Sequence, residues 1–466
     1  MKIRLLTLTL SISLGVSSIT ANATDLTDIY RMALENDPQL LRAASERDAA
    51  KSSVDVSRAD WWPQINLQVG YSYRDVESAN IDNPNVINST RTRTFGQEIN
   101  LSQQVFNLGT WRSTGIVEKQ AYQAEVNYLL SRQQLMLRVT DAYFNVLAAQ
   151  DNLEFARAEK RAIERQLDQT RQRFSVGLIA ITDVHEAQAQ YDNVLAQEIQ
   201  AQNQVEIALE ALREITGRSH QDIQVLNTER FDPASPQPTG ARRWVDTAHE
   251  RNLQLLISRS ALEIADQNIE LARTGHYPTV RLSASYGNSD ATRHSGDQRL
   301  RTNGLNTSEI GLQLNLPLYL GGRTVASTEE ARNDYVAVSQ TLEENRRQVE
   351  RTVRTAYLDV VANISTIRAL EQAVVSAESA LNATQAGFEV GTRTIVDVLD
   401  STRNLFNARR NLSEARYGYI RGVLTLEQAA GTISEDDLFA VNDALMPAER
   451  AETPEAPIPD PDIQQQ

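Results

Sequence analysis

Two hydrophobic periodicities alternate along the chain and predict two kinds of element. Long stretches place apolar residues at every seventh position, which is typical of helices that pack as coiled coils. The clearest series is Val139, Val146, Leu153, Leu167 and Phe174, with Lys160 as its one exception. Elsewhere apolar and polar residues alternate, which predicts strands with one apolar face. These stretches are residues 65–73, 95–105, 280–286 and 310–318, from which we expect four strands of about 9 to 11 residues each.

The whole pattern occurs twice. Residues 112–173 contain no proline and one glycine, so they predict a helix about 93 Å long. The sevenfold series returns in the second half at Val353, Val360, Ile367, Val374, Leu381 and Phe388. Two matching runs 214 residues apart are Phe174-Ser175-Val176-Gly177 and Phe388-Glu389-Val390-Gly391. Because such a period is far too long for a solenoid, the repeat indicates duplication into one pseudo-symmetric unit.

This pattern divides the chain into five parts. Residues 1–23 have a basic start, an apolar run too short to span a bilayer and an A-x-A cleavage site, which predicts a signal peptide. Residues 24–217 and 243–445 are the two repeats, each with a helix, a strand hairpin and a long helical hairpin. A proline-containing linker, residues 218–242, joins them. The acidic, proline-rich residues 446–466 are expected to be disordered.

Composition excludes several classes of function. The 466 residues include 46 basic and 61 acidic side chains, and the net charge of −15 argues against a nucleic-acid partner. The absence of cysteine excludes disulfides, thiolate metal sites and cysteine nucleophiles. The five histidines stand singly, without the spacing of a metal pair, and no cofactor-binding motif is complete. We therefore expect no enzyme, no metal and no cofactor.

The strands allow two interpretations, a soluble sandwich or tilted strands that cross a membrane. Two features favour an outer-membrane barrel. The connections at residues 75–92 and 288–304 are long and polar. Aromatic residues cluster where strands meet helices, at Trp61, Trp62, Phe106, Trp111, Tyr277 and Tyr319, as in an interfacial girdle. Since four strands cannot close a barrel, such a barrel must be shared between subunits.

Each long helical hairpin is expected to turn at a glycine and to resume at an acid. The helices break at Val176-Gly177 and Val390-Gly391 and resume near Asp183 and Asp397. Asp183 and Asp397 each fit an N-cap with an acid three residues later, so helix capping is one interpretation. If several tips converge on an axis, Asp397 and Asp400 would instead form a ring of carboxylates that favours cations. The two interpretations are compatible.

The tip sequences resemble a known family. Residues 391–400, Gly-Thr-Arg-Thr-Ile-Val-Asp-Val-Leu-Asp, and residues 173–184 resemble the two hairpin-tip motifs of the TolC family of outer-membrane exit ducts. The similarity extends over residues 25–445. It implies a mixed α and β membrane protein, a homotrimer in which three chains of four strands form one transmembrane β-barrel. This barrel would be continuous with a long periplasmic α-helical coiled-coil barrel.

The resemblance also implies a function and partners. A TolC-type duct lies in the outer membrane of a Gram-negative cell, in contact with outer-membrane lipid, and has a large periplasmic portion. With a periplasmic adaptor (membrane fusion) protein and an inner-membrane RND or ABC transporter, it exports drugs or secreted proteins. It is closed at its periplasmic end by links between tip helices and opens when its partners engage.

Carried onto this chain, the resemblance assigns roles to the tip residues. The pore selectivity ring falls on Asp397 and Asp400. Gate links fall on Thr182, Asp183, Arg393 and Phe388. Adaptor docking falls on the turns Val176-Gly177-Leu178 and Val390-Gly391-Thr392, for which helix-ending glycines are the simpler interpretation. The family has a tyrosine at the position of Phe388, so one hydroxyl link is missing here.

A protein of another class remains an alternative. A periplasmic coiled-coil scaffold without a pore would use the same helices and would form a soluble sandwich from the strands. It would stay soluble without detergent, whereas a channel would need detergent for extraction.

Overall fold

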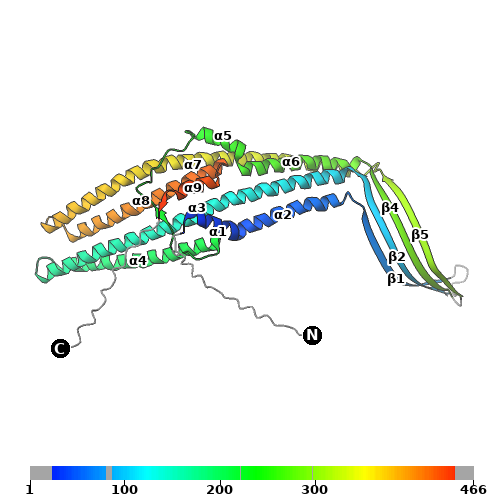
Figure 1. Ribbon diagram of the computed structural model, residues 1–466, viewed down its shortest axis with the longest axis horizontal. Helices are drawn as coiled ribbons and strands as arrows, with labels where there is room; N and C mark the ends of the chain where they lie inside the picture. The colour runs from blue at the N-terminus through cyan, green and yellow to red at the C-terminus, as the bar shows by residue number, and fades with distance from the viewer. Residues whose placement is uncertain (1–23, 80–86, 221, 296–297, 447–466) are drawn as a thin grey trace, which may run out of the picture.

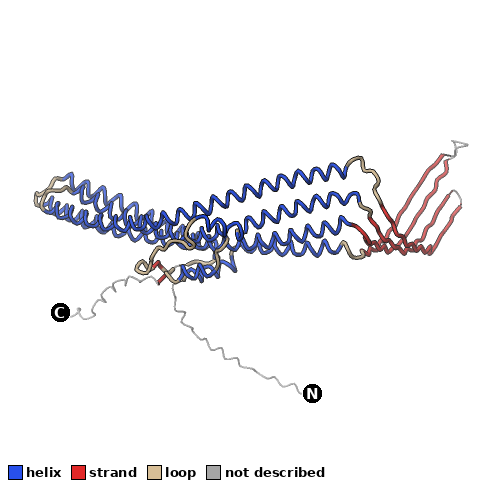
Figure 2. Tube along the Cα trace, turned by 90° about the horizontal axis from the view of Figure 1, so that it is seen from above, coloured by secondary structure: helices blue, strands red, loops and turns tan. Residues whose placement is uncertain are grey.

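The computed structural model describes residues 24–79, 87–220, 222–295 and 298–446. The predicted signal peptide, residues 1–23, and the tail beyond Met446 lie outside the described residues. A long bundle of helices continues at one end into a four-stranded sheet (Figure 1). In a perpendicular view all the long strands lie at this end and the helical hairpins reach the other (Figure 2).

The same order of elements occurs in both halves. The first half contains α1 (Leu26–Asn36), α2 (Pro38–Ala59), β1 (Gln64–Ala79), β2 (Ile87–Asn107), α3 (Leu108–Ser175) and α4 (Ile181–Thr216). The second contains α5 (Ala241–Arg251), α6 (Leu253–Arg273), the 3-10 turn η1 (Thr274–His276), β4 (Thr279–Ser295), β5 (Gln298–Asn315), α7 (Arg323–Glu389) and α8 (Ile395–Ala430). After α9 (Glu435–Asn442), the short strand β6 (Leu445–Met446) pairs with β3 (Val225–Leu226).

The opening helix of each half is interrupted, where the sequence pattern predicts one continuous helix. Asp37 ends α1 and its side chain caps α2, accepting from the Leu40 N–H at 2.8 Å, while Pro38 occupies the first turn of α2. Asn252 separates α5 from α6 in the same way and accepts from the Leu255 N–H at 3.1 Å. Both caps satisfy backbone donors that the first turn of a helix leaves free.

The strands are longer than their hydrophobic alternation. They contain 16, 21, 17 and 18 residues, so the expected length of 9 to 11 is wrong. Most residues of the two connections that were expected to be polar loops belong to strands. β1 runs to Ala79 and β2 starts at Ile87, while β4 runs to Ser295 and β5 starts at Gln298. Backbone hydrogen bonds along the ladder hold these polar stretches in the sheet without an apolar face.

The sheet has the order β1-β2-β4-β5 and every pair is antiparallel. Its apolar face is uncovered within one chain: Ile65, Leu67 and Ile310 are 66%, 67% and 78% exposed. The predicted aromatic residues lie at the junction with the helices, and Trp62 and Tyr319 are exposed there. Among the residues that the structure describes, no helix combines the length and hydrophobicity needed to cross a bilayer.

The helices pack as two antiparallel hairpins, α3 with α4 and α7 with α8 (Figure 1). Val139, Val146 and Leu167 of the apolar series predicted for α3 are buried, whereas Leu153 is half-buried and Phe174, at the hairpin tip, is 41% exposed. Lys160, the exception in that series, reaches across to α4, where its Nζ lies 2.6 Å from Glu198. The heptad position therefore carries an interhelical ion pair in place of an apolar contact.

The largest core lies midway along the bundle, where α1, α3, α4, α8 and α9 meet. Tyr143 and Phe144 are fully buried there, and the Tyr143 hydroxyl donates to the Gln224 carbonyl at 2.8 Å. Asp37, which is 2% exposed, accepts two hydrogen bonds from Arg138 at 2.7 and 3.1 Å. This core fixes α1 and α9 against α3, α4 and α8.

One acid in this region is poorly accommodated as a carboxylate. Burial, followed by the nearby charge of Asp437, raises the pKa of Glu427 to about 7. The Glu427 Oε2 atom has no hydrogen-bond partner among the described residues. Asp437 itself accepts from the Ser434 N–H and hydroxyl at 2.8 and 2.9 Å, as part of the cap of α9.

This pKa predicts a pH dependence of stability. In the unfolded chain a glutamate titrates near pH 4.3, about 3 units lower, so between these two values the folded protein binds more protons than the unfolded one. Stability should therefore fall as pH rises from about 4 to about 7, the interval between the two pKa values. We expect Glu427→Gln to unfold at a higher temperature than wild type at pH 8 and to show a weaker pH dependence, as measured by circular dichroism. Glu414→Gln, an exposed site on the same helix, is the control, and an equal response of both variants would contradict the assignment.

Candidate functional site

The two hairpin tips lie side by side at the end of the bundle far from the sheet (Figures 1 and 2). We call residues 176–180 the α3–α4 tip and residues 390–394 the α7–α8 tip. A hydrophobic cluster joins the helices behind them, with members from all four helices: Ile163, Leu167, Ala187, Val194, Phe388, Ile395, Val398 and Leu399. Within one chain the two tips are therefore packed as one unit.

Both turns depend on a glycine with a positive φ. Gly177 and Gly391 have φ of 77° and 78°, a conformation that side chains with a Cβ rarely adopt. In the first turn the Leu178 N–H donates to the Arg173 carbonyl at 3.0 Å, and in the second the Thr392 N–H donates to the Gly387 carbonyl at 2.9 Å. These bonds satisfy carbonyls at the helix ends.

The turns present apolar side chains to solvent. Val176, Leu178 and Val390 are 69%, 73% and 76% exposed, and Gly177, Gly391 and Thr392 lie beside them at the surface. A Cβ added at either glycine would meet no atom within 4 Å. The six residues assigned to adaptor docking thus lie on two adjacent, open turns.

Asp397 takes part in a helix cap, but not as the N-cap residue that its spacing predicts. The N-cap of α8 is Thr394, whose hydroxyl accepts from the Asp397 N–H at 3.3 Å. The Asp397 Oδ2 atom accepts from the Thr394 N–H and hydroxyl, each at 2.9 Å, which completes a capping box. Asp183 is likewise inside its helix, because α4 begins at Ile181 and Ala180 occupies the N-cap without a side-chain bond. The N-cap assignment is wrong for both aspartates.

The electrostatics of the two ring candidates differ. Hydrogen bonds from Thr394 and then the charge of Arg393 hold the pKa of Asp397 below its usual range, so this group is ionised at neutral pH. The Asp400 carboxylate is paired with Arg403 of the same helix at 2.7 Å. The negative charge of Asp397 is therefore neutralised less by its own helix than that of Asp400.

Phe388 is buried and contacts an arginine of the other hairpin. The guanidinium carbon of Arg173 lies 4.6 Å from the centroid of the Phe388 ring, within the range of a cation–π contact. Arg173 Nη1 also donates to the Phe388 carbonyl at 3.5 Å. A ring without a hydroxyl thus still contributes to the contact between hairpins.

The remaining gate candidates stay apart within one chain. Thr182 and Arg393 are exposed and Asp183 is half-buried. In the described part of the chain Arg393 forms no ion pair with either of them. The sequence-based predictions did not include Arg173, Thr394 or Arg403. Two of these could have been found from spacing. Thr394 and Asp397 have the Thr-x-x-Asp spacing of a capping box, and Asp400 and Arg403 have the Asp-x-x-Arg spacing of a helical ion pair.

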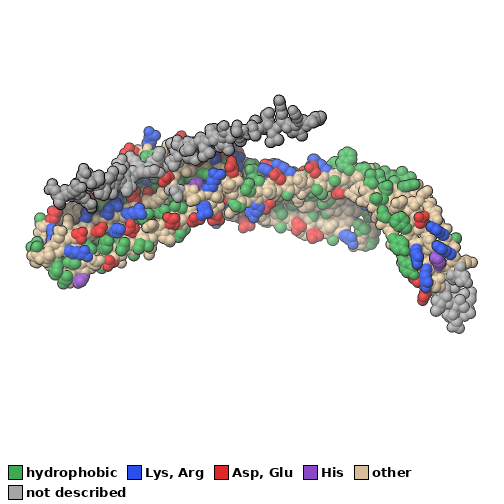
Figure 3. Space-filling model, turned by 60° about the horizontal axis from the view of Figure 1, so that its bottom comes forward, with side chains coloured by type: hydrophobic (Ala, Val, Ile, Leu, Met, Phe, Trp, Pro, Cys, Tyr) green, Lys and Arg blue, Asp and Glu red, His purple; other side chains and the backbone are tan. Residues whose placement is uncertain are grey.

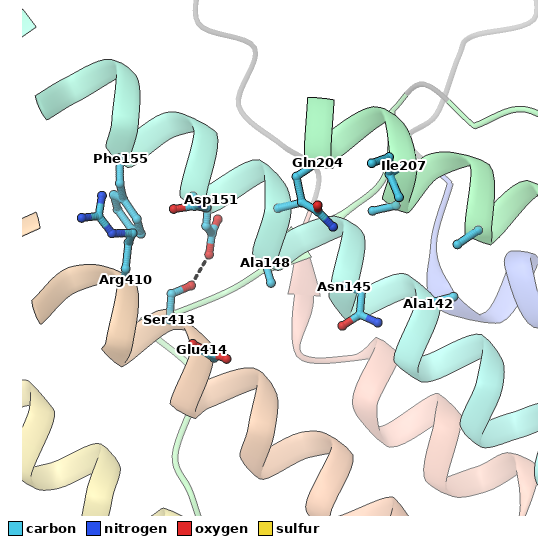
Figure 4. Close-up of a pocket in the computed structure, with 14 residues that line it drawn as sticks. Ala142, Asn145, Ala148, Asp151, Phe155, Gln204, Ile207, Arg410, Ser413 and Glu414 are labelled. Carbon is cyan, nitrogen blue, oxygen red and sulfur yellow. Dashed lines mark hydrogen bonds between the residues drawn. The ribbon is translucent and has the colours of Figure 1, made fainter. Parts of the chain in front are cut away.

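A pocket elsewhere in the bundle, between α3, α4 and α8, has no catalytic arrangement (Figure 4). Its polar groups bond to one another: Asp151 accepts from Ser413 and, at 2.7 Å, from the Tyr417 hydroxyl. Nearby, Arg410 donates to the buried Glu159 at 3.2 Å. Among the described residues no group of three potential metal ligands occurs.

Comparisons with known proteins agree with this architecture. The family model described as outer membrane efflux protein matches residues 29–218 and 244–432. The outer membrane protein TolC of Vibrio cholerae is 47% identical over 449 residues, 96% of this chain and 100% of that protein. The proteases secretion protein PrtF of Dickeya chrysanthemi is 30% identical over 92% of this chain and 93% of its own length. The solved structure of the CmeC outer membrane channel of Campylobacter jejuni superposes with a TM-score of 0.73 at 16% identity, covering 96% of this chain and 98% of that one.

These matches decide between the two interpretations of the strands. They cover both halves of the chain and extend through the sheet as well as the helices. The alternative of a pore-free periplasmic scaffold is thereby set aside. The chain belongs to the outer membrane efflux protein family: it is a TolC-type exit duct of the outer membrane with a large periplasmic part, and a transport protein, not an enzyme.

Proposed function

We propose that three copies of this chain form the duct, and that the hairpin tips close its periplasmic end. The observation that carries the proposal is the arrangement of the tips. Apolar residues lock the two hairpins of one chain together, while among the described residues the side chains of Thr182, Arg393 and Asp397 form no hydrogen bond or ion pair with the other hairpin. These three polar side chains are therefore available to bind a neighbouring subunit.

In this proposal Arg393 of one subunit links to Thr182 and Asp183 of the next. The arginine is exposed at the turn, and its planar guanidinium can donate to a carboxylate and a hydroxyl at once. Phe388 takes part through Arg173, which holds the α7–α8 tip against the α3–α4 tip. Opening then separates Arg393 from its partners while each pair of hairpins moves as a unit.

The carboxylates of Asp397 form the selectivity ring. The capping box occupies Oδ2 and leaves Oδ1 without a hydrogen bond among the described residues, so the same side chain can cap α8 and face a lumen. Asp400 adds less negative charge, because Arg403 pairs with it. A ring of three ionised carboxylates at a narrow entrance favours cations over anions.

The exposed turns supply the docking surface for a periplasmic adaptor protein, which connects the duct to an inner-membrane RND or ABC transporter. Val176, Leu178 and Val390 would be covered on docking, which removes apolar surface from water. The relatives named for efflux and for protease secretion suggest drugs or secreted proteins as cargo.

The ring can be tested by single-channel recording in a planar bilayer. Asp397→Asn keeps the acceptor of the capping box and removes the charge, so the preference for cations should largely disappear. Asp400→Asn should have a smaller effect because its charge is already paired. Glu250→Gln, at an exposed site on α5, is the control. Unchanged selectivity in Asp397→Asn would leave this aspartate as a helix cap only.

The gate can be tested in the same recordings. Arg393→Ala removes the proposed link between subunits, so the resting conductance should rise several-fold. Arg403→Ala is the matched control, since this arginine pairs within its own helix and its loss should alter selectivity without opening the duct. A resting conductance equal to wild type in Arg393→Ala would refute the link.

The docking surface can be tested by export. Val176→Asp, Leu178→Asp and Val390→Asp place charges on the turns, so each should reduce cross-linking to the adaptor and lower drug resistance in cells. Val56→Asp, on α2 and 72% exposed in the wild type, tests for a general effect of surface charge. Full resistance in all three tip variants would place docking elsewhere.

A further inference from the structure

The far end of the sheet carries arginines on the same face as its apolar residues. Residues paired across antiparallel strands point to the same side, and alternate residues point to opposite sides. The apolar face of β1, residues 65–73, pairs with Leu101, Ile99 and Phe95 of β2. Figure 3 shows basic side chains gathered near the far end of the strands, next to hydrophobic ones.

Two consecutive rows on this face are basic. The first row across the sheet is Tyr73, Arg93, Thr292 and Arg301, and the second is Asp75, Arg91, His294 and Arg299. We call these eight residues the arginine rows. They hold four guanidinium groups and one carboxylate. All four arginines are exposed.

Few of these charges are compensated. Arg91 Nε lies 3.1 Å from Asp75, whereas Arg93 lies over the Tyr73 ring, 5.8 Å from its centroid. Arg301 donates to the Asn303 side chain at 2.8 Å, and Arg299 has no ion pair within the described ranges. The other acids of this face are Glu77, beyond the rows, and Asp290, whose carboxylate accepts from the Gly304 N–H at 2.6 Å.

On β1 and β2 the rows lie where the apolar face ends. From Ile65 to Tyr73 the strand rises about 27 Å, close to the height of the apolar band of an outer-membrane barrel. On β4 and β5 the last apolar residues of this face before the rows are Tyr286 and Ile310. The row residues of these two strands therefore lie farther from the apolar band than those of β1 and β2. Because the helices lie at the opposite end of the strands, on the periplasmic side, the rows lie at the external leaflet.

We propose that the arginine rows bind the phosphate groups of phosphorylated glycolipids in the external leaflet. Charge and position both fit this ligand. An arginine fork pairs bidentately with phosphate, and basic side chains at the boundary of a bilayer attract anionic headgroups. The extension of the rows away from the apolar band suits a sugar headgroup that projects from the bilayer surface.

The opposite face offers a matched control. Arg74 pairs through Thr92 with Arg293 in the intervening row, so both arginines point to the other side of the same strands. That side forms a hollow lined by polar residues such as Gln68, Thr94 and Glu98. Arg74 and Arg293 share the height and charge of the arginine rows but face away from lipid.

The test measures binding of lipid A to the full-length protein in phosphatidylcholine nanodiscs by native mass spectrometry. The variant Arg93→Gln/Arg299→Gln/Arg301→Gln should bind bisphosphorylated lipid A about 100-fold more weakly than wild type, at roughly fivefold per arginine. Arg74→Gln/Arg293→Gln should bind as wild type does. Dephosphorylated lipid A should bind wild type as weakly as bisphosphorylated lipid A binds the triple variant. Millimolar inorganic phosphate should not displace the bound lipid.

Three outcomes would overturn the proposal: equal loss of binding in both variants, unchanged binding in the triple variant, or equal binding of the two forms of lipid A. Displacement by inorganic phosphate would assign the rows to a soluble anion. The comparison of the two lipids uses only wild type, so it holds even if a variant does not fold. The proposal rests on the outer-membrane location of the family and not on the gate.

Discussion

The sheet imposes the constraint on which the other features depend. Within one chain β1 and β5 are edges, and each leaves backbone N–H and C=O groups without partners in a neighbouring strand. In a bilayer every such group must be hydrogen-bonded within the protein, since lipid offers no substitute. An apolar face with two open edges is therefore stable in a membrane only when other copies close it. The proposed trimer satisfies this requirement, and it also brings three pairs of helical hairpins around one axis.

The helices extend this arrangement far from the membrane. Buried heptad residues hold each hairpin together, and the central core fixes α1, α9 and the β3–β6 pair against them. At the tips the hydrophobic cluster and the Arg173–Phe388 contact join both hairpins of one chain. At the tips the contacts within a subunit are mainly apolar, whereas the groups left for a neighbour are polar or charged. A gate built in this way can open without exposing the cores of its own subunits.

The sheet also explains why polar residues occur in long strands. Beyond Tyr73 the alternation of apolar and polar residues ends, yet β1 continues to Ala79 and pairs with β2 throughout. Hydrogen bonds between strands do not require a particular side chain, so the ladder persists where the sequence contains arginine, threonine and asparagine. The arginine rows lie in this polar extension.

The sequence alone determined the duplication, the coiled-coil helices, the apolar face of the strands and the glycine turns, because these features depend on local periodicity or on a backbone conformation that favours glycine. It could not determine where each strand ends, because polar strands lack hydrophobic periodicity. It also could not determine the interruption at Asp37, because the burial of this residue depends on Arg138, which lies about 100 residues away in the sequence. Tertiary structure alone decided that Phe388 contacts Arg173 and that four arginines from two strands share one face. Both features bring together residues that are distant in sequence, and only the folded chain fixes them.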